Sequence, residues 1–482
     1  MSSILNAHDF EEVAERTLSK KTWAFYSSAA TDCITRDRNA TFFSRIWFRP
    51  RALRNVSKVD TRSRMLGHDI DLPLFISPAA MAKLVDPEGE KAMAAGCVKT
   101  RIPQCISTNA SFPAEDIVAA APKDHPFFFQ LYVNKDRPKT EALLHRIWDL
   151  GVRTIFVTVD APVPGKREAD ERVKADEGLS SAVSGAKAGN DAKGGGLGRI
   201  MGSYIDDSLS WDDLPWLRKH FKGKIVIKGI QSAMDAKACA DAGLDGVLLS
   251  NHGGRSLDTA PPAIMVLVEC QRVCPEIFDK IEVYVDSGIR RGTDLVKCLC
   301  LGATAVGMGR SFLFSLNYGK EGIEHLIESK LLITCHFEDD ELTPTSHARR
   351  GRGDHEDARS DRHFTAAPGP CQHARCGRTR IENSTPPIRP ATEDESGQIV
   401  DIDMYDAHVS AENVRKSILI ITCATFHREF HPILMSKTPA GGNSTNARPF
   451  GAGAEAPSHD RRPRDLTRDT VRHDNYDLRL TL

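Results

Sequence analysis

Short apolar runs recur along the first two thirds of the chain, with segments of helical periodicity between them. The runs occupy residues 72–80, 103–108, 127–132, 154–160, 224–229, 246–252, 282–288 and 305–310. They are almost continuously apolar rather than alternating, which is typical of parallel strands covered on both faces. Segments such as KTEALLHRIWDLG and GTDLVKCLCLGA separate them. Eight strands alternating with helices predict an α/β fold, a (β/α)8 TIM barrel over 72–330.

The segments outside this rhythm have a different composition. Residues 1–71 are predicted to form an N-terminal helical cap. Residues 168–205 are charged and then rich in Gly, Ala and Ser, which predicts a long mobile loop after the fourth strand, where barrel active sites lie. After about residue 330 the apolar periodicity fades, so 331–482 is predicted to be an irregular, disordered tail.

Composition disfavours several classes of partner. The 482-residue chain carries a formal net charge of −1, which gives no overall field for nucleic acid or an anionic membrane. No window of about 18 apolar residues predicts a transmembrane helix. The start, MSSILNAHDFEEVAE, resembles neither a signal peptide nor an Arg-rich transit peptide. We therefore expect a cytoplasmic protein, with a mitochondrial location as the alternative.

The cysteines predict reduced thiols rather than a disulfide framework. There are 12 of them, many in apolar stretches such as CLCLGA, as expected in a reducing compartment. The set His363, Cys371, His373 and Cys376 resembles a zinc site superficially, but its spacing matches no closed structural zinc pattern. No metal site is predicted.

Polar residues collect at the carboxyl ends of the predicted strands, where the chemistry of a barrel is carried out. They are Ser77, Ser107, Gln130, Tyr132, Thr158, Asp160, Lys228, Ser250, His252, Asp286, Gly309 and Arg310. A lone hydroxyl among them is explained equally well by capping of the following helix. The whole set predicts an active site.

The segment SNHGGR, at 250–255, combines residue types suited to catalysis. Asp160 is placed to hold the imidazole of His252 in one tautomer and to stabilise its protonated form, and Arg255 offers a fork for a carboxylate. A satisfied core histidine is the alternative. The later turns DSGIRRG and GMGR, with Arg290 and Arg310, suit a phosphate, unless their glycines serve only tight turns.

These motifs together resemble a known family. SNHGGR, QLYVNKDR, TVDAPVPGKREAD, VIKG, DSGIRRGTD and GMGR are similar, in order and over about residues 5–328, to motifs of the FMN-dependent L-2-hydroxyacid dehydrogenases and oxidases. That family includes glycolate oxidase, lactate oxidase and the flavin domain of flavocytochrome L-lactate dehydrogenase. The resemblance implies FMN across the barrel mouth, a small lactate-like L-2-hydroxy acid as substrate, and a homotetramer. It leaves oxygen, cytochrome c or quinone as the electron acceptor.

The resemblance also implies a role for each matching residue. His252 would be the base, with Asp160 beside it, as two electrons pass from the substrate to flavin N5; the sequence leaves open whether the route is proton abstraction or hydride transfer. Tyr132, Arg167, Arg255 and the position of Phe25 would contact the substrate. FMN would be held by Pro78, Ala79, Ala80, Ser107, Gln130, Thr158, Lys228, Ser250, Asp286, Ser287, Gly288, Arg290, Gly309 and Arg310.

Four positions depart from the family pattern. Phe25 stands where the family has a tyrosine whose hydroxyl helps to bind the substrate carboxylate, and Asn109 stands where relatives carry a side chain that sizes the pocket. DSGIRRG replaces the usual Asp-Gly-Gly, and Ser311 replaces the usual proline. The identity of the 2-hydroxy acid therefore stays open at this point.

Two alternatives to an active hydroxyacid dehydrogenase remain. An FMN barrel of the isopentenyl diphosphate isomerase type is disfavoured by TVDAP, KREAD and SNHGGR. A flavin-binding but catalytically impaired family member is the other alternative, because the chain after NYGKEGIEHLIE ceases to resemble the family. We hypothesise that this last part derives from a retained intron or a shifted reading frame; a disordered regulatory extension is the competing explanation.

Overall fold

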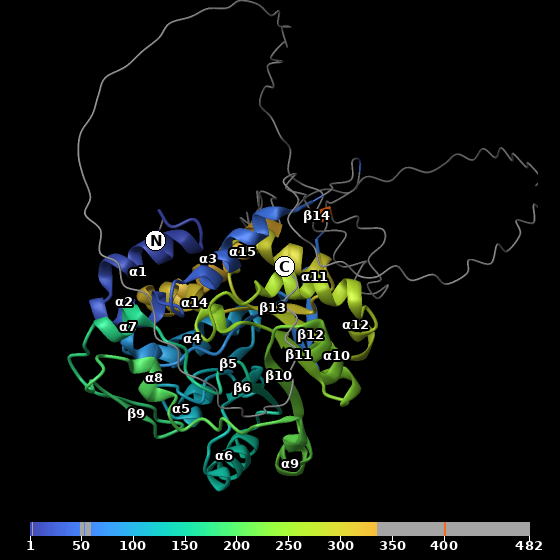
Figure 1. Cartoon of the computed structure of the whole chain (residues 1–482). Helices are drawn as coiled ribbons and strands as arrows, with labels where there is room; N and C mark the ends of the chain where they lie inside the picture. The colour runs from blue at the N-terminus through green and yellow to red at the C-terminus, as the bar shows by residue number, and fades with distance from the viewer. Residues whose placement is uncertain (2, 49–52, 54–58, 335–399, 402–482) are drawn as a thin grey trace, which may run out of the picture. The chain divides into compact units, whose positions relative to one another are not determined.

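Eight parallel strands close into a barrel in this computed structural model, which describes residues 1, 3–48, 53, 59–334 and 400–401 (Figure 1). The strands are β4 (Leu74–Ile76), β5 (Gln104–Ile106), β6 (Phe127–Leu131), β7 (Thr154–Thr158), β10 (Lys224–Ile230), β11 (Gly246–Leu249), β12 (Glu282–Val285) and β13 (Ala305–Met308). They pair in chain order, and β13 closes the ring against β4. The predicted (β/α)8 barrel is confirmed.

Each predicted apolar run coincides with one barrel strand, and every strand except β10 is shorter than its run. The run 154–160, for example, leaves the ladder after Thr158, whose partner on β10 is Lys228. Asp160, His252 and Asp286 follow the ends of their strands, whereas Gln130, Thr158 and Lys228 lie on the strands themselves. Both groups lie at the carboxyl ends of the strands, where barrel enzymes carry their chemistry.

Helices cover the outside of the barrel. They are α4 (Gly89–Cys97), α5 (Ala114–Ala119), α6 (Arg137–Asp149), α9 (Leu214–His220), α10 (Ala233–Asp241), α11 (Ala263–Val273), α12 (Ile277–Lys280), α13 (Gly292–Cys300), α14 (Arg310–Ser315) and α15 (Gly319–Thr334). The start of α10 shows how the sequence sets a boundary: the Ser232 hydroxyl accepts a hydrogen bond from the Asp235 amide, which satisfies an end group of the helix.

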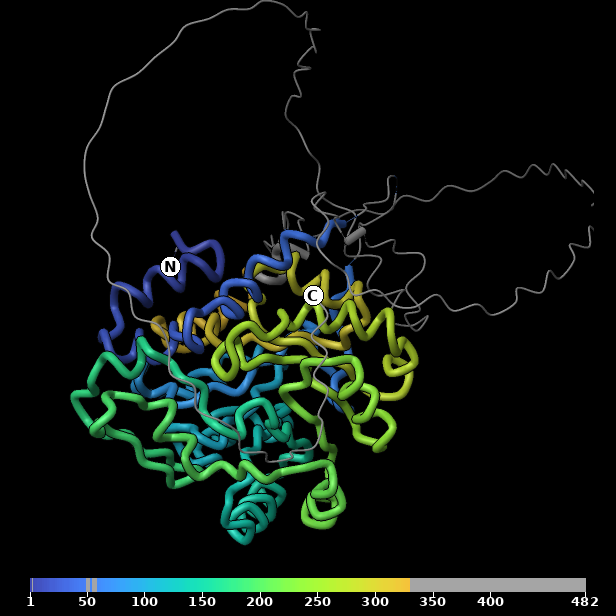
Figure 2. The backbone as a smooth tube through the Cα atoms, in the orientation of Figure 1, coloured from blue at the N-terminus to red at the C-terminus, as the bar shows by residue number. Residues whose placement is uncertain are grey.

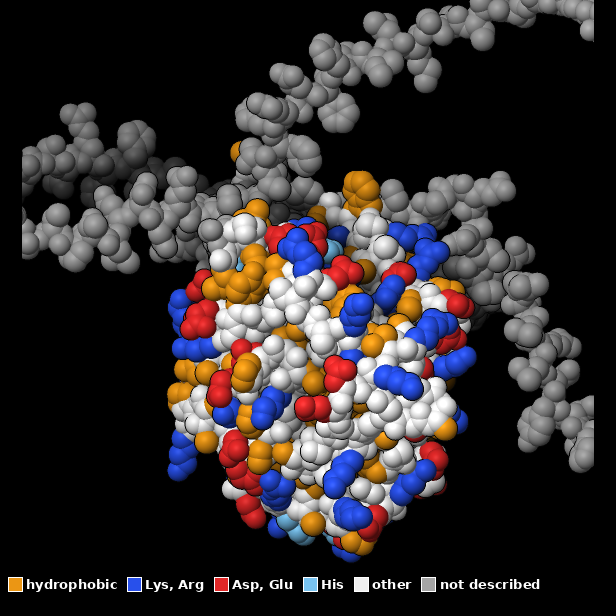
Figure 3. All heavy atoms as spheres, turned by 90° about the vertical axis from the view of Figure 1, so that its left-hand side faces the viewer, with side chains coloured by type: hydrophobic (Ala, Val, Ile, Leu, Met, Phe, Trp, Pro, Cys, Tyr) orange, Lys and Arg blue, Asp and Glu red, His pale blue; other side chains and the backbone are white. Residues whose placement is uncertain are grey.

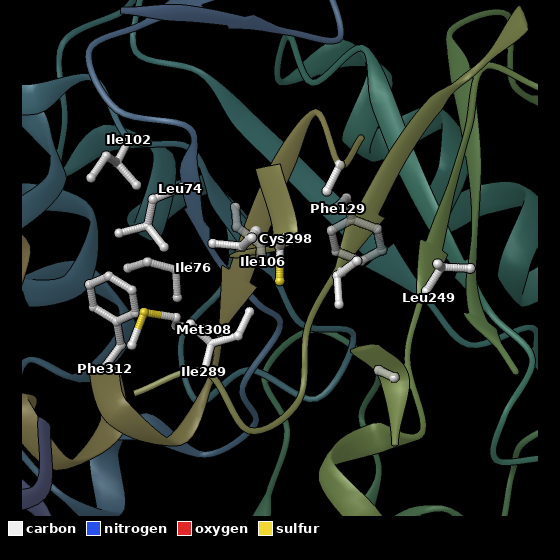
Figure 4. Packing of buried hydrophobic residues seen from close by; sticks show 14 of the residues in the cluster. Leu74, Ile76, Ile102, Ile106, Phe129, Leu249, Ile289, Cys298, Met308 and Phe312 are labelled. Carbon is white, nitrogen blue, oxygen red and sulfur yellow. The ribbon is translucent and has the colours of Figure 1, made fainter. Parts of the chain in front are cut away.

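The barrel strands are buried on both faces, which is why they read as continuous apolar runs. Phe75, Phe128, Phe156 and Tyr284 belong to a cluster inside the barrel. The residues between them face outward, and Figure 4 shows several of these packed between strands and helices, among them Leu74, Ile76, Phe129, Leu249 and Met308. Together the two layers hold the strand ends in fixed positions.

The N-terminal segment is more than the helical cap that the sequence predicts. It contains α1 (Ala7–Thr17), α2 (Lys20–Ser27), α3 (Ile34–Thr41), β1 (Ile46–Trp47), β2 (Ser63–Met65) and β3 (His68–Ile70). The helix α1 packs on α14, which Figure 2 shows as blue and yellow segments side by side. The β2–β3 hairpin instead packs on the inner cluster, where the Leu66 amide bonds Glu282 at the start of β12. The segment thus contacts both ends of the barrel.

The insertion 168–205, predicted as a long mobile loop, carries regular structure. It contains α7 (Glu168–Arg172), β8 (Leu179–Ser180), β9 (Lys187–Ala188) and α8 (Leu197–Met201). Arg199 forms ion pairs with both Glu171 and Asp191. Composition did not indicate these contacts, because the partners are brought together only by the path of the folded loop. Its mobility stays a prediction.

The described residues carry surface charges of both signs and several cysteines. Basic and acidic side chains are interspersed on the face in Figure 3. No helix in the described part of the chain is long and apolar enough to cross a membrane, and none of the described residues form a cluster of three potential metal ligands. The eight described cysteines are free thiols.

Two sequence-based interpretations lie outside the described residues. They are the candidate zinc set at 363–376 and most of the irregular tail predicted over 331–482, of which 335–399 and 402–482 are not described. The predicted start of that tail is wrong, because helix α15 continues through 331–334. The strand β14 (Val400–Asp401) is described, and it pairs in parallel with β1.

Candidate active site

A pocket opens at the carboxyl ends of the barrel strands and gathers most of the predicted site residues. Its lining includes Phe25, Pro78, Ala79, Ala80, Ser107, Gln130, Tyr132, Thr158, Arg167, Lys228, His252, Arg255, Asp286, Ser287, Gly288, Arg290, Gly309 and Arg310. Two predicted residues, Asp160 and Ser250, do not line the pocket. They lie behind its wall and contact the residues that do.

His252 lies between an acid and a phenol. Its Nδ1 is 2.8 Å from Oδ1 of Asp160, and its Nε2 is 3.4 Å from the Tyr132 hydroxyl. The Asp160 side chain is 0 % exposed and that of His252 is 23 % exposed. This geometry assigns the proton of neutral His252 to Nδ1, which donates to Asp160. Nε2 is thereby left as a base at the pocket.

Burial and the charge of the partner have opposite effects on the pKa of each residue in this pair. Burial lowers the pKa of His252, and the carboxylate of Asp160 partly opposes the effect. Burial alone would raise the pKa of Asp160, but the charges of Lys228 and His252 outweigh it, so that pKa lies below its usual value. The site therefore contains a neutral base supported by an ionised carboxylate.

Lys228 is a buried ammonium group at the end of β10. Its Nζ lies 3.4 Å from Oδ2 of Asp160 and donates to the Ser250 hydroxyl at 3.1 Å. Burial would lower the pKa of Lys228, but Asp160 and Asp286 outweigh that effect and raise it. Lys228 thus stays charged, and Ser250 positions it from behind the wall.

A glycine allows strands β7 and β10 to bring these charges together. Gly229 has φ +105°, in the left-handed region, and a Cβ there would lie 2.5 Å from Cβ of Asp160. The ladder between β10 and β11 is irregular between Lys228 and Ile230. Any larger residue at 229 would therefore push Asp160 away from Lys228 and His252.

The two glycines of SNHGGR serve the protein's own packing. A Cβ on Gly253 would lie 2.7 Å from a guanidinium nitrogen of Arg310, and one on Gly254 would lie 2.5 Å from the Arg36 amide. These glycines allow two arginine-bearing segments to approach closely, and Gly253 also lines the pocket. His252 itself has φ 58°, held by these close approaches.

A row of polar side chains crosses the ends of β5, β6 and β7. Gln130 Nε2 donates to the Thr158 hydroxyl at 3.0 Å, and the Ser107 hydroxyl lies 3.4 Å from Gln130 Oε1. All three are buried and line the pocket. They form a connected row of donors and acceptors along one wall of the pocket.

Tyr26, to which the sequence gave no role, holds the turn on the opposite side. Its hydroxyl contacts the backbone oxygens of Ala80 at 3.0 Å and Met81 at 2.6 Å. Glu90 is also buried and accepts from the Ala82 amide at 3.0 Å. No pattern in the sequence signals the Tyr26 contacts, because they join α2 to residues 54 and 55 positions further along the chain. The Tyr26 and Glu90 contacts fix residues 80–82, which continue from the lining residues 78–80.

Several further lining residues were missed by sequence reasoning. Among them, Arg36 comes from the N-terminal segment, and Met201, Gly202 and Ile205 come from the insertion. Met201 and Ile205, in RIMGSYID, are apolar residues in an otherwise polar and Gly-rich segment, and this was the signal available for a buried contact. It was overlooked because the segment was predicted to be mobile.

One end of the pocket is arranged for an anion such as a phosphate. Arg310 is half-buried near Arg290, and burial together with that second charge lowers its pKa to about 10. Gly288 has φ +84°. Ser287 has φ 77°, where glycine is favoured, and its hydroxyl donates to Asp286 and accepts from the Gly253 amide. Arg290 also pairs with Glu11 of α1 at 3.0 Å.

A second group of cations suits a carboxylate. Burial and the nearby charges of Arg167 and Arg310 hold the pKa of Arg255 well below its usual range. Arg255 donates to the Tyr26 backbone oxygen at 2.9 Å and lies 5.3 Å from the centre of the Phe25 ring. Within the part of the chain described, the buried Nε of Arg167 has no hydrogen-bond partner. Bound anions would stabilise these charges.

The pocket therefore fits FMN by the chemistry of its lining. Arg310 and the turns at 286–290 and 307–310 suit the phosphate, the row Ser107, Gln130 and Thr158 suits the ring edge, and Lys228 suits negative charge on the ring. The predicted ring contacts and phosphate contacts thus fall on one continuous surface. Ser250 supports that surface without lining it.

The chain matches a family model described as FMN-dependent dehydrogenase over residues 14–331. It is 45 % identical over 338 residues to the L-lactate dehydrogenase (cytochrome) of Saccharomyces cerevisiae, covering 68 % of this chain and 56 % of that protein. It is 38 % identical to the 2-hydroxyacid oxidase 2 of Bos taurus, covering 66 % and 89 %. The chain thus spans little more than half of the first of these relatives.

Solved structures give the same picture. The recombinant flavin-binding domain of baker's yeast flavocytochrome b2 is similar with a TM-score of 0.61 and 42 % identity, covering 68 % of this chain and 81 % of that one. A mandelate oxidase with (S)-4-hydroxymandelic acid is similar with a TM-score of 0.63 and 31 % identity, covering 68 % and 92 %.

Proposed function

The chain belongs to the FMN-dependent dehydrogenase family, and from that premise we propose that it oxidises a small, lactate-like L-2-hydroxy acid to the 2-oxo acid. The observation that carries this proposal is the pairing of His252 with Asp160 in one pocket with Arg167 and Arg255. A base and a carboxylate anchor are the two groups that such a substrate needs.

His252 takes the proton that the oxidation releases. Its Nε2 faces the pocket, because Nδ1 is engaged by Asp160 at 2.8 Å. As Nε2 gains the proton, the ionised Asp160 stabilises the imidazolium cation that forms. The Tyr132 hydroxyl lies 3.4 Å from Nε2 and stays protonated, since burial raises the pKa of Tyr132. It supplies a hydrogen bond to the reacting oxygen of the substrate.

Arg255 and Arg167 bind the substrate carboxylate. Both are half-buried at the pocket, and Arg167 offers an unpaired Nε among the described residues. Their charge fixes the substrate so that its Cα and hydroxyl face His252. Lys228, held by Asp160, keeps a positive charge in the pocket wall next to the His252–Asp160 pair. When bound, FMN accepts the two electrons that leave the substrate.

An anaerobic absorbance measurement on the purified chain tests this proposal. We expect a flavin band near 450 nm that bleaches when L-lactate is added without oxygen. A flavin band that L-lactate and other small L-2-hydroxy acids leave unchanged would contradict the proposed activity. Oxygen consumption and reduction of cytochrome c, measured side by side, identify the electron acceptor.

Replacement of the base provides the matched test. We expect His252→Gln to keep bound flavin and to lose about 10²–10⁴-fold in the rate of flavin reduction, which is the usual contribution of a positioned base. His145→Gln is the control, because His145 is exposed on α6, on the outside of the barrel. Turnover of His252→Gln within a few-fold of the unmodified enzyme would show that another group is the base.

A further inference from the structure

Asn109 is a polar side chain in the pocket that none of the roles above use. It follows β5, is 5 % exposed, and lines the pocket with Met201 and Ile205. Its Oδ1 accepts hydrogen bonds from the Ser184 hydroxyl at 2.7 Å and from the Tyr204 hydroxyl at 3.1 Å. Both donors come from the insertion after β7.

These two contacts orient the amide. The Ser184 oxygen also accepts from the Ala186 amide at 3.2 Å, so its proton is directed to Asn109. Burial raises the pKa of Tyr204, which therefore stays protonated and able to donate. With Oδ1 engaged twice, the Nδ2 amino group of Asn109 is turned away from the insertion.

Nδ2 is the unused half of this amide. Among the residues that the structure describes, it has no hydrogen-bond partner, and Asn109 lines the pocket. Nδ2 is not one of the fully buried unpaired atoms of the described residues, so it is accessible from the pocket, and a ligand oxygen placed there would accept its hydrogen bond. The apolar side chains of Met201 and Ile205 offer no such oxygen.

The surroundings favour a neutral acceptor. Ser184 and Tyr204, which hold Asn109, are uncharged, and Asn109 itself carries no charge to balance a second carboxylate. A buried carboxylate without a counter-charge would be strongly disfavoured. A hydroxyl accepts from Nδ2 without that cost.

We propose that Asn109 selects L-2-hydroxy acids whose side chain carries a hydroxyl on C3, the class of L-2,3-dihydroxy acids, over those with an alkyl side chain. This inference rests on the proposed oxidation of a 2-hydroxy acid. It names the substrate class of that same pocket.

L-glycerate and L-2-hydroxybutyrate are the matched probes, because they differ only in a terminal hydroxyl against a methyl group. We expect anaerobic flavin reduction to favour L-glycerate by about fivefold or more in kcat/KM, the gain of one hydrogen bond. Asn109→Leu should reverse the preference. The non-reacting 2-oxo acids, hydroxypyruvate and 2-oxobutyrate, should show the same order in their Kd values from flavin difference spectra.

Asn190→Leu is the control variant, because Asn190 lies exposed in the same insertion and bonds only Ala175 there. Asn109→Ala serves if Asn109→Leu fails to bind flavin. A preference of the unmodified enzyme for L-2-hydroxybutyrate, or a ratio that neither Asn109 variant changes, would overturn the assignment and leave the proposed function intact. Flavin that no 2-hydroxy acid reduces would overturn both.

Discussion

At the scale of single residues, the pocket depends on charges that burial opposes. Asp160 is fully buried, yet it stays ionised because Lys228 and His252 flank it. His252 stays neutral because its own burial outweighs the carboxylate beside it. The protonation state of each group depends on the others. Substitution of one of them should therefore change the pKa values of the remaining groups.

The pH dependence of activity should report this coupling. Since His252 must be neutral to act as a base and its pKa is lowered, we expect activity to be complete above about pH 6.5 and to fall on the acid side of that value. Asp160→Asn removes the group that raises the His252 pKa. The acid limb should therefore move to lower pH while kcat falls by about 10²-fold or more.

Profiles of kcat/KM between pH 5 and 9 give the measurement for Asp160→Asn. Asp207→Asn is the control, because Asp207 forms an exposed ion pair with Lys135. An acid limb that moves to higher pH in Asp160→Asn, or an unchanged kcat, would argue against the pairing of Asp160 with His252.

Phe25→Tyr should lower the apparent KM for L-lactate. Phe25 is 5 % exposed, lines the pocket and lies 5.3 Å from the Arg255 guanidinium, so a hydroxyl on its ring would add a donor beside the carboxylate anchor. A hydrogen bond to a charged group contributes about 1.5–3 kcal/mol in favourable cases. Phe25→Leu, without a hydroxyl, is the control. An unchanged or higher KM would indicate that the pocket is shaped around Phe25.

At the scale of elements, the insertion is held to the N-terminal segment by one buried ion pair. Lys21 of α2 donates to the Asp170 backbone oxygen at 2.6 Å and pairs with its carboxylate; the side chains are 8 % and 1 % exposed. Asp170 in turn accepts from the Gly198 amide at 3.0 Å. This contact bridges α7 and α8, between which the chain carries Ser184 and Asn190.

Lys21→Met should loosen the insertion. Removal of one partner leaves Asp170 buried without its counter-charge, a loss of about 3–5 kcal/mol in comparable buried pairs. We expect faster cleavage within 168–205 in limited proteolysis, followed by mass spectrometry. Lys20→Met, on the exposed side of the same helix, is the control. Equal cleavage of the two variants would mean that other contacts hold the insertion.

At the scale of the whole molecule, the barrel closes over a concentration of positive charge. Lys228, Arg167, Arg255 and Arg310 lie around one pocket, with burial opposing each charge. Asp160 and Asp286 balance only part of it. The described fold is therefore arranged to gain stability from an anionic ligand at its centre.

FMN should raise the melting temperature of the apoprotein. Binding to the folded state alone contributes about 2.7 kcal/mol when free ligand is a hundred times its Kd. Riboflavin, which lacks the phosphate, should give a smaller increase, because Arg310 then keeps its unfavourable burial. Scanning fluorimetry with both ligands makes the comparison. Equal increases would show that the phosphate does not bind at Arg310.

Much of the architecture followed from local patterns. Continuous apolar runs at 154–160 and 224–229 identified strands buried on both faces, since such strands need no polar alternation. The polar ends of those runs identified the mouth, because parallel strands bring their carboxyl ends together. The sequence did not predict the β2–β3 hairpin, because its three-residue strands are too short to show a hydrophobic period.

The amino-acid sequence by itself determined the barrel, the family and the set of chemical groups at the strand ends, because these depend on residue type and order along the chain. Tertiary structure alone decided which groups meet. Asp160 lies 92 positions from His252, and Asn109 lies 95 from Tyr204. Such contacts depend on how strands close into a ring and how an insertion folds back, and no local pattern in a single sequence encodes those distances.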